Sequence, residues 1–180
     1  MGVVEDFERV VGEGGVVVFP SDTVYGLACD PENAAAIERM YALKGRDRGK
    51  PAARMWFSVD ALPPLTPGVE AAARALLPGP VPLVVGELGI RVPDVPLLRG
   101  AAVCVLQTSA NLAGGQDPRT PAEVPREIRD GADLVLDGGE LPGVPSTVVD
   151  LGAYEETGEW TVLREGALSR DRLALCLRHS

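Results

Sequence analysis

The residues best suited to chemistry in this sequence form a short cluster of cations, K-G-R-D-R-G-K-P, at positions 44–51. Within seven residues it holds four cations, Lys44, Arg46, Arg48 and Lys50. The chain has 15 arginines and only two lysines, and both lysines lie here, which indicates two positions that need a compact ammonium group. Neighbouring cations repel one another unless an anion binds, so the cluster predicts a phosphate site, with a solvated surface loop as the alternative. It is not a Walker A loop, because its glycine spacing is one residue short and Pro51 occupies the Ser/Thr position.

Two further polar segments directly follow apolar runs of strand length. Ser21–Gly26 follows the run Val16–Phe19, and Thr108–Asn111 follows Val103–Leu106. Ligands often bind at strand ends in α/β sheets, so these hydroxyl and amide groups are candidate substrate contacts, although ordinary turn chemistry is the favoured explanation of each segment when taken alone. Three more ambiguous features lie at the edges of expected strands, namely Arg91, Pro145–Thr147 and Arg164.

The rare residues and the net charge exclude several classes of protein. The only histidine is the penultimate residue, His179, which excludes Ser-His-Asp and Cys-His hydrolases and multi-histidine metal sites. Cys29, Cys104 and Cys176 form no C-x-x-C pair and are expected to be buried free thiols. A net charge of −9 argues against a protein that coats nucleic acid. The acidic start is unlike a signal peptide and the apolar runs are too short to span a membrane, so a cytoplasmic protein is expected.

The elements that must position these residues alternate between helices and β-branched runs, which predicts an α/β or α+β domain, 1–180, built on a mixed sheet. Helices are expected from Glu5 to Glu13 and after three proline-containing caps, Asp30-Pro31, Thr66-Pro67 and Thr120-Pro121, with Ser169 capping a last helix. Besides the two runs above, strands are expected at Arg54–Phe57, Leu83–Val85, Leu134–Leu136, Thr147–Leu151 and Trp160–Leu163. A hairpin turn at Glu155–Glu159 would make the last pair antiparallel.

Seven short blocks, taken in order from Val16 to about Ala167, resemble the threonylcarbamoyl-AMP synthase (YrdC-like) family in its short, single-domain form. They are P-S-D-T-V-Y-G-L (20–27), K-G-R-D-R-G-K-P (44–51), L-P-G-P (77–80), I-R-V-P (90–93), T-S-A-N-L-A-G (108–114), P-S-T-V-V-D-L (145–151) and L-R-E-G-A (163–167). Each block alone has moderate specificity, but the ordered set is highly specific.

The resemblance implies a twisted mixed β-sheet with flanking helices and a basic concave cleft. It also implies a nucleotidyltransferase that condenses L-threonine, bicarbonate or CO2, and ATP into threonylcarbamoyl-AMP and pyrophosphate, with Mg2+ expected alongside ATP. A separate tRNA transferase complex would use the product to make N6-threonylcarbamoyladenosine at position 37. By the resemblance, Lys44 and Arg46 are catalytic and bind ATP together with Lys50, Ser109, Asn111 and Arg164, whereas L-threonine is bound by Thr23, Arg91 and Ser146. No acidic pair identifies a protein ligand for a metal ion. Direct contact with tRNA would be weak.

The sequence departs from the family pattern at Val81-Pro82, at Ala52–Met55 and at Glu165, the residue after Arg164. These departures leave a diverged paralogue open as an alternative. Such a paralogue would be an RNA-binding module without catalysis, or an enzyme acting on another carbamoyl substrate. An RNA-binding module is disfavoured by the acidic charge and by the 4% aromatic content, because single-strand binders need stacking platforms. From sequence alone, replacing Lys44 or Arg46 by alanine is expected to abolish pyrophosphate release and to leave the thermal melt nearly unchanged.

Overall fold

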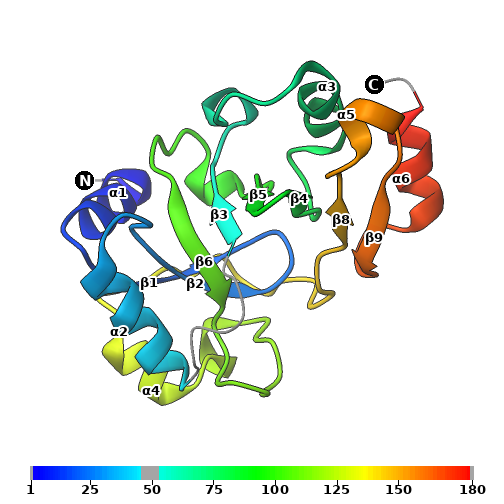
Figure 1. Cartoon of the computed structure of the whole chain (residues 1–180). Helices are drawn as coiled ribbons and strands as arrows, with labels where there is room; N and C mark the ends of the chain where they lie inside the picture. Colours follow the sequence, from blue (N-terminus) through cyan, green and yellow to red (C-terminus); the bar gives the residue numbers. More distant parts are fainter. Residues whose placement is uncertain (1, 46–52, 179–180) are drawn as a thin grey trace.

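The computed structural model describes residues 2–45 and 53–178, in which nine strands form one mixed sheet of order β7-β1-β2-β6-β3-β5-β4-β8-β9 (Figure 1). The strands are β1 (Val17–Pro20), β2 (Tyr25–Cys29), β3 (Ala53–Met55), β4 (Leu83–Val85), β5 (Leu88–Arg91), β6 (Val105–Ser109), β7 (Leu134–Val135), β8 (Val148–Asp150) and β9 (Thr161–Arg164). Three neighbouring pairs are parallel, β1·β7, β3·β5 and β4·β8, and the other five are antiparallel. The predicted mixed sheet with flanking helices is confirmed.

Helices cover both faces of the β1–β2 end of the sheet, because the side chains of a strand alternate between its faces. Val17 and Phe19 of β1 pack with α1 (Val3–Gly12) and with the single turn η2 (Pro96–Leu98). Val18 of β1 and Leu27 of β2 belong to a second cluster that contains buried residues of α2 (Ala34–Lys44) and α4 (Arg126–Gly131). This end of the sheet is therefore enclosed between α1 on one side and α2 and α4 on the other (Figure 1).

Helices cover only one face of the opposite end of the sheet. Leu83 of β4, Ile90 of β5 and Val149 of β8 form a third cluster with α3 (Pro67–Leu76) and α6 (Arg170–Leu177). The short helix α5 (Tyr154–Thr157) lies beside α3, where Glu155 accepts hydrogen bonds from the first backbone N–H groups of that helix. Figure 1 shows α3, α5 and α6 gathered around β4, β8 and β9. The remaining single turns are η1 (Val59–Ala61) and η3 (Pro121–Glu123).

Two of the predicted helix starts are wrong, in each case because of a local hydrogen bond or a proline. Asp30 accepts the backbone N–H of Glu32 in a turn, so α2 begins only after Asn33, whose side chain accepts the N–H of Ala36. Thr120 caps a single turn, η3, instead of a longer helix, since Pro125 has no N–H to continue it and α4 begins after that residue. The predicted caps at Thr66 and Ser169 are confirmed as helix starts, and Ser169 accepts the N–H of Arg172.

The sequence reasoning also missed two strands and misjudged one turn. β2 and β5 were not expected, because their short segments contain glycine and follow polar turn residues. The antiparallel pairing of β8 with β9 is confirmed, but the connection contains the helix α5 instead of a tight hairpin turn. Gly158 ends that helix with a left-handed backbone (φ 70°), a conformation that favours glycine.

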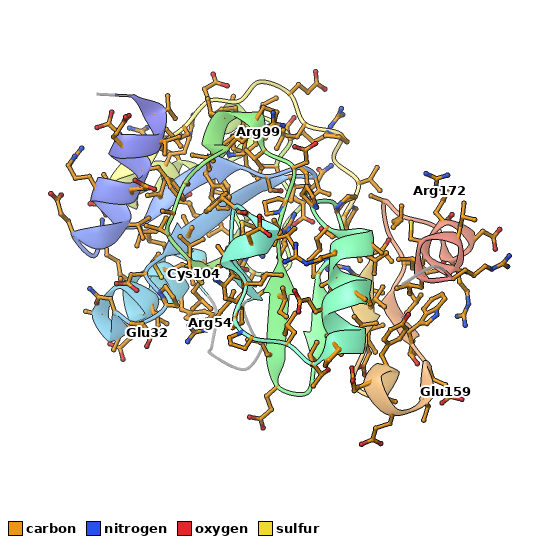
Figure 2. The ribbon with its side chains drawn as sticks, turned by 90° about the horizontal axis from the view of Figure 1, so that it is seen from above. Glu32, Arg54, Arg99, Cys104, Glu159 and Arg172 are labelled. Atoms are coloured by element: carbon orange, nitrogen blue, oxygen red, sulfur yellow. The ribbon has the colours of Figure 1, made fainter. Side chains whose placement is uncertain are left out.

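All three cysteines are free, but only Cys29 is buried, so the expectation of three buried thiols is wrong for Cys104 and Cys176, which are half-buried. Burial raises the pKa of the Cys104 thiol, an effect that the neighbouring Arg54 guanidinium partly opposes. Arg54 also pairs with Glu32 at 2.8 Å, and Figure 2 shows these residues on one side of the molecule. Within residues 2–45 and 53–178, no helix combines the length and the apolar character of a transmembrane span.

Candidate functional site

A cavity of about 760 Å³ lies on the face of the sheet that the helices leave open. Seven strands contribute to its lining, β2, β3, β4, β5, β6, β8 and β9, and no described helix does. In β2, the cavity residue Gly26 lies between Tyr25 and Leu27, whose side chains pack toward α2. In β5, the cavity residue Gly89 precedes Ile90, whose side chain packs toward α3 and α6. The cavity is therefore on the opposite face of the sheet from these helices, and its volume is typical of a small-molecule site.

The base of the cavity is formed by small residues, which leave its volume unfilled. Gly26, Ala53 and Gly89 come from three different strands and line it without a long side chain. Gly26 has a second reason to be glycine, since a Cβ atom there would lie 2.8 Å from the ring of Phe19. One wall is apolar, with Pro82, Leu83, Val84, Val148 and Leu163. The other wall carries hydroxyl, amide and guanidinium groups, so the cavity suits a ligand with both polar and apolar parts.

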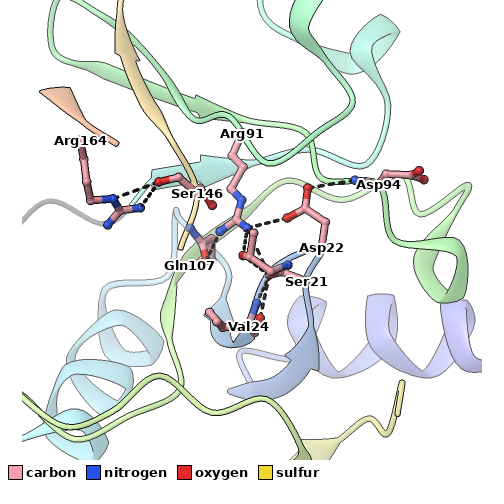
Figure 3. A network of polar contacts seen from close by, with 9 residues as sticks. Ser21, Asp22, Val24, Arg91, Asp94, Gln107, Ser146 and Arg164 are labelled. Atoms are coloured by element: carbon pink, nitrogen blue, oxygen red, sulfur yellow. Dashed lines mark hydrogen bonds and ion pairs between the residues drawn. The ribbon is translucent and has the colours of Figure 1, made fainter. Parts of the chain in front are cut away.

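Arg91 forms the centre of the polar wall (Figure 3). Its side chain is buried, and Nη2 donates to Ser21 Oγ at 3.1 Å, Asp22 Oδ1 at 2.8 Å and Thr23 Oγ1 at 3.0 Å. Nη1 has only a long contact, 3.4 Å, with Oε1 of Gln107, and Nε is buried without a partner. Because a guanidinium can bind two oxygens of one anion, Arg91 is a candidate anion-binding group in this wall.

The turn that holds Thr23 is fixed by the hydroxyl of Ser21. Ser21 Oγ accepts the backbone N–H groups of Thr23 and Val24 and donates to the carbonyl of Val24 at 2.7 Å. Asp22 reaches from the same turn to Arg91, and its second oxygen accepts the N–H of Asp94 at 3.3 Å (Figure 3). These bonds join the β1–β2 turn to the residues that follow β5, so the two segments are held in fixed relative positions.

Lys44 lies at the end of α2 and is buried, with 2% of its surface exposed. Its Nζ donates to the backbone carbonyl of Ser109 at 2.5 Å, to Oδ1 of Asn111 at 2.7 Å and to Oγ of Ser109 at 3.2 Å. Ser109 Oγ also donates to Asn111 Oδ1 at 2.6 Å, and the Asn111 amide nitrogen donates to the carbonyl of Gly115. The ammonium group thus holds the segment after β6 in a single conformation beside the cavity.

Arg164 fixes the segment that enters β8 (Figure 3). Both Nε and Nη2 donate to the carbonyl of Ser146, at 3.0 and 2.9 Å. Gly166 packs directly against the backbone of Pro145 and Ser146, where an added Cβ atom would overlap it. Arg164 is exposed and Ser146 is buried, so the guanidinium lies at the mouth of the cavity and the hydroxyl lies inside it.

The structure brings most of the predicted site residues together. Five of them line the cavity from five separate parts of the sequence, namely Thr23, Arg91, Ser109, Ser146 and Arg164. Lys44 and Asn111 adjoin it through their bonds to Ser109. Arg46 and Lys50, the other predicted phosphate ligands, lie outside the described residues. So does Ala52, whereas Ala53, Arg54 and Met55 form β3.

Sequence reasoning placed Ser21 and Asp22 only in a segment of candidate substrate contacts and gave no role to Gln107, but all three belong to the polar network around Arg91. Ser21 and Asp22 were visible within the block P-S-D-T-V-Y-G-L, and Gln107 directly precedes T-S-A-N. The acids Glu87 and Asp117 also line the cavity, opposite in charge to Arg91 and Arg164. Among the described residues, no group of three or more histidine, cysteine or acidic side chains is arranged to hold a metal ion.

Comparison with known proteins decides the family. The model of the Sua5/YciO/YrdC family, described as "Telomere recombination", matches residues 9–166. The chain belongs to this family. A relative from Thiobacillus denitrificans named threonylcarbamoyl-AMP synthase is 34% identical over 162 residues, which cover 77% of this chain and 85% of the relative. A human relative with the same name is 32% identical over 189 residues, covering 90% of this chain and 66% of the relative.

A solved structure supports the same membership. The crystal structure of P. abyssi Sua5 complexed with L-threonine matches with a TM-score of 0.83 at 25% identity, over 96% of this chain. This chain spans 56% of the length of that Sua5 chain. The Sua5/YciO/YrdC family thus includes proteins named threonylcarbamoyl-AMP synthases and a structure that binds L-threonine, and the cavity of this chain lies in the part of the fold that is shared.

Proposed function

We propose that this chain is an L-threonylcarbamoyl-AMP synthase that condenses L-threonine, bicarbonate or CO2, and ATP, and releases pyrophosphate. The observation that carries the proposal is the convergence of Thr23, Arg91, Ser109, Ser146 and Arg164 on one cavity of about 760 Å³. A cavity of this size has room for an amino acid beside a nucleotide. Membership of a family with relatives named for this product supplies the reaction class.

The amino acid would occupy the part of the cavity around Arg91. The guanidinium would attract the carboxylate of L-threonine, and the hydroxyls of Thr23 and Ser146 would be available to its polar groups. Because Asp22 already pairs with Arg91 at 2.8 Å, the guanidinium is held in place before the substrate arrives. Such preorganisation avoids the loss of side-chain entropy that binding would otherwise require.

The nucleotide would occupy the part near Ser109 and Arg164. Ser109 and Asn111 would contact it from the segment after β6, which Lys44 holds through three hydrogen bonds. Arg164 would reach the adenylate portion from the mouth of the cavity. Arg46 and Lys50 belong to the same proposal as phosphate ligands, on the strength of their residue types and their position directly after Lys44.

The chemistry needs electrostatic stabilisation more than a protein nucleophile. The amine of threonine is carboxylated, the carbamate oxygen attacks the α-phosphorus of ATP, and the bond to pyrophosphate breaks. Negative charge increases on the departing pyrophosphate, where positioned cations are the effective catalysts. ATP would arrive as its Mg2+ complex, and its own phosphates would hold the ion, since the described residues offer no acidic cluster for it.

The departures from the family pattern are compatible with the fold. The carbonyl of Pro82 accepts the N–H of Val149 at 3.0 Å, so the strand pairing continues across the proline. Ala53, Arg54 and Met55 form β3, which is paired on both sides. Glu165 is exposed. We propose that the product passes to a separate tRNA transferase complex in the cytoplasm, for N6-threonylcarbamoyladenosine formation at position 37, with at most weak contact between this chain and tRNA.

Pyrophosphate release from Mg2+-ATP, with L-threonine and bicarbonate each omitted in turn, tests the proposal. Release that needs both substrates is expected. Arg164→Leu is expected to raise the KM for ATP by about tenfold, the effect of losing one hydrogen-bonding cation. The exposed Arg126→Leu on α4 makes the same charge change far from the cavity and should match the wild type. Release that ignores L-threonine, or no release from a folded protein that binds ATP, would overturn the proposal and favour a diverged paralogue.

A further inference from the structure

Tyr25 is a buried side chain whose hydroxyl binds an exposed connection of the fold. The residue lies on β2 with 0% of its surface exposed. Its hydroxyl accepts the backbone N–H of Gly138 at 2.9 Å and donates to the carbonyl of Gly139 at 2.8 Å. Both glycines belong to residues 136–147, the connecting strap, which runs from β7 at one end of the sheet to β8 near the other end (Figure 1). One hydroxyl group therefore holds the strap both as a donor and as an acceptor.

The strap has two further attachments between these glycines and the cavity. The N–H of Leu141 donates to the carbonyl of Arg119 at 2.9 Å, and the Leu141 carbonyl accepts Nε of Arg119 at 3.1 Å. The N–H of Gly143 donates to the carbonyl of Thr23 at 2.9 Å. The strap is thus tied to the β1–β2 turn through Thr23 and to the strand that follows this turn through Tyr25. A segment held at one point can pivot, whereas a segment held at three points keeps its direction.

The strap leads directly into the cavity. Ser146 follows Gly143 by three residues, and it lines the cavity together with Thr23. Arg164 holds the Ser146 carbonyl from β9, and the strap approaches the same residue from the side of the β1–β2 turn. We propose that Tyr25 is a positioning residue, whose hydroxyl sets the spacing between Thr23 and Ser146 for the amino-acid substrate. The proposal rests on the proposed function, because it assigns both of these hydroxyls to one substrate.

The backbone of Tyr25, in contrast to its hydroxyl, holds the nucleotide side of the cavity. Its N–H donates to the carbonyl of Pro118 at 2.9 Å, and its carbonyl accepts the N–H of Ala110 at 2.8 Å. These two bonds fix both ends of the segment that carries Asn111, and Tyr25→Phe leaves them in place. Loss of the hydroxyl is therefore expected to affect recognition of the amino acid and to spare recognition of ATP.

A purely structural role for the hydroxyl makes a different prediction. Gly138 and Gly139 are exposed, so in Tyr25→Phe water can satisfy the N–H and the carbonyl that lose their partner, and the aromatic ring can stay buried. If the hydroxyl only adds stability, the variant melts at a slightly lower temperature and keeps normal kinetics wherever it is folded. If the hydroxyl positions the strap, the kinetics change even at temperatures far below the melt.

A second variant moves the strap without altering Tyr25. A Cβ atom at Gly138 would lie 2.6 Å from Cγ of Pro20, so Gly138→Ala is expected to push the strap away from β1. The matched control is Tyr154→Phe, which removes another tyrosine hydroxyl. That hydroxyl donates to the carbonyl of Leu177 at 3.4 Å and lies outside the cavity lining.

The experiment measures pyrophosphate release from Mg2+-ATP by the full chain and the three variants, first with L-threonine varied and then with ATP varied. Thermal melts of the same proteins show that each is folded at the assay temperature. Tyr25→Phe and Gly138→Ala are each expected to raise the KM for L-threonine by about tenfold, the effect of one displaced hydrogen bond to the substrate. The KM for ATP should stay within about twofold, and Tyr154→Phe should match the wild type for both substrates.

A folded Tyr25→Phe whose KM for L-threonine stays within about twofold of the wild type would overturn the inference, and so would an equal rise in the KM for both substrates. If Tyr25→Phe fails to fold, Gly138→Ala decides in its place by the same criterion. A wild type that needs L-threonine for pyrophosphate release, with variants that use it equally well, refutes the Tyr25 inference alone. A wild type whose release ignores L-threonine refutes the proposed function, and this inference with it.

Discussion

Replacing Lys44 by methionine, which keeps the aliphatic length and removes the ammonium, should lower both stability and activity. The side chain is 2% exposed, and Nζ makes two short bonds, to the Ser109 carbonyl at 2.5 Å and to Asn111 Oδ1 at 2.7 Å. At about 1.5 kcal/mol for each bond from a charged donor, the loss is about 3 kcal/mol of unfolding free energy. For a chain of this size that corresponds to a melting temperature about 6–12 °C lower.

This expectation revises the one made from sequence, in which the thermal melt was to remain nearly unchanged. The reason is burial, because a lysine in a solvated loop has little to lose, whereas Lys44 fixes the segment after β6. Thermal melts followed by circular dichroism, together with pyrophosphate release, separate the two effects. Arg126→Met, on an exposed face of α4, is the control and should melt close to the wild type.

A Lys44→Met variant that melts within about 2 °C of the wild type would refute the reasoning, because the buried bonds would then contribute almost nothing. If that stable variant were also inactive, Lys44 would act on the phosphates alone. A less stable variant that keeps full activity would show that Lys44 is needed only to hold the Ser109–Asn111 segment in place.

Two further predictions concern packing and protonation. Gly166→Ala should lose about 2 kcal/mol of stability in urea denaturation, because the new methyl group would overlap the Pro145 carbonyl and lie 2.6 Å from the carbonyl carbon of Ser146. The control Gly12→Ala, whose methyl group would meet nothing within 4 Å, should keep the stability of the wild type. Equal stability of the two variants would contradict the close backbone contact. Burial raises the pKa of the Cys29 thiol from 9.0 to about 12, so the folded state keeps a proton that the unfolded state releases. Stability should therefore fall as the pH rises from about 9 toward 12, and Cys29→Ala should flatten this dependence over the same range. Parallel curves for the two proteins would argue against the raised pKa.

Local sequence signals correctly predicted those helices and strands whose position depends on a single residue or on one apolar run. Ser169 predicted the start of α6, and the apolar run Leu83–Val85 matches β4. Local signals failed where a neighbour's hydrogen bond or proline intervened, as at Asp30 and Pro125. They failed for β2 as well, since that strand is stabilised by its pairing with β1 and β6 on both sides, and no local pattern contains that information.

The sequence by itself determined the chemistry available to this protein. The two lysines in one cluster and the lack of a catalytic histidine favoured anion binding and phosphate chemistry, and the ordered blocks predicted the family. Residue types and their order along the chain are sufficient for this, because they fix which groups can donate, accept or carry charge.

Only the tertiary structure decided which of those groups meet. The order of the sheet places β6 between β2 and β3, and β5 beside β3, which brings Gln107 to Arg91 and both to the turn that holds Asp22. The burial of Lys44 likewise results from contact between α2 and the segment after β6. These contacts join residues that are 16 to 69 positions apart, and such distant pairings depend on sheet register and helix packing, which no local sequence pattern specifies.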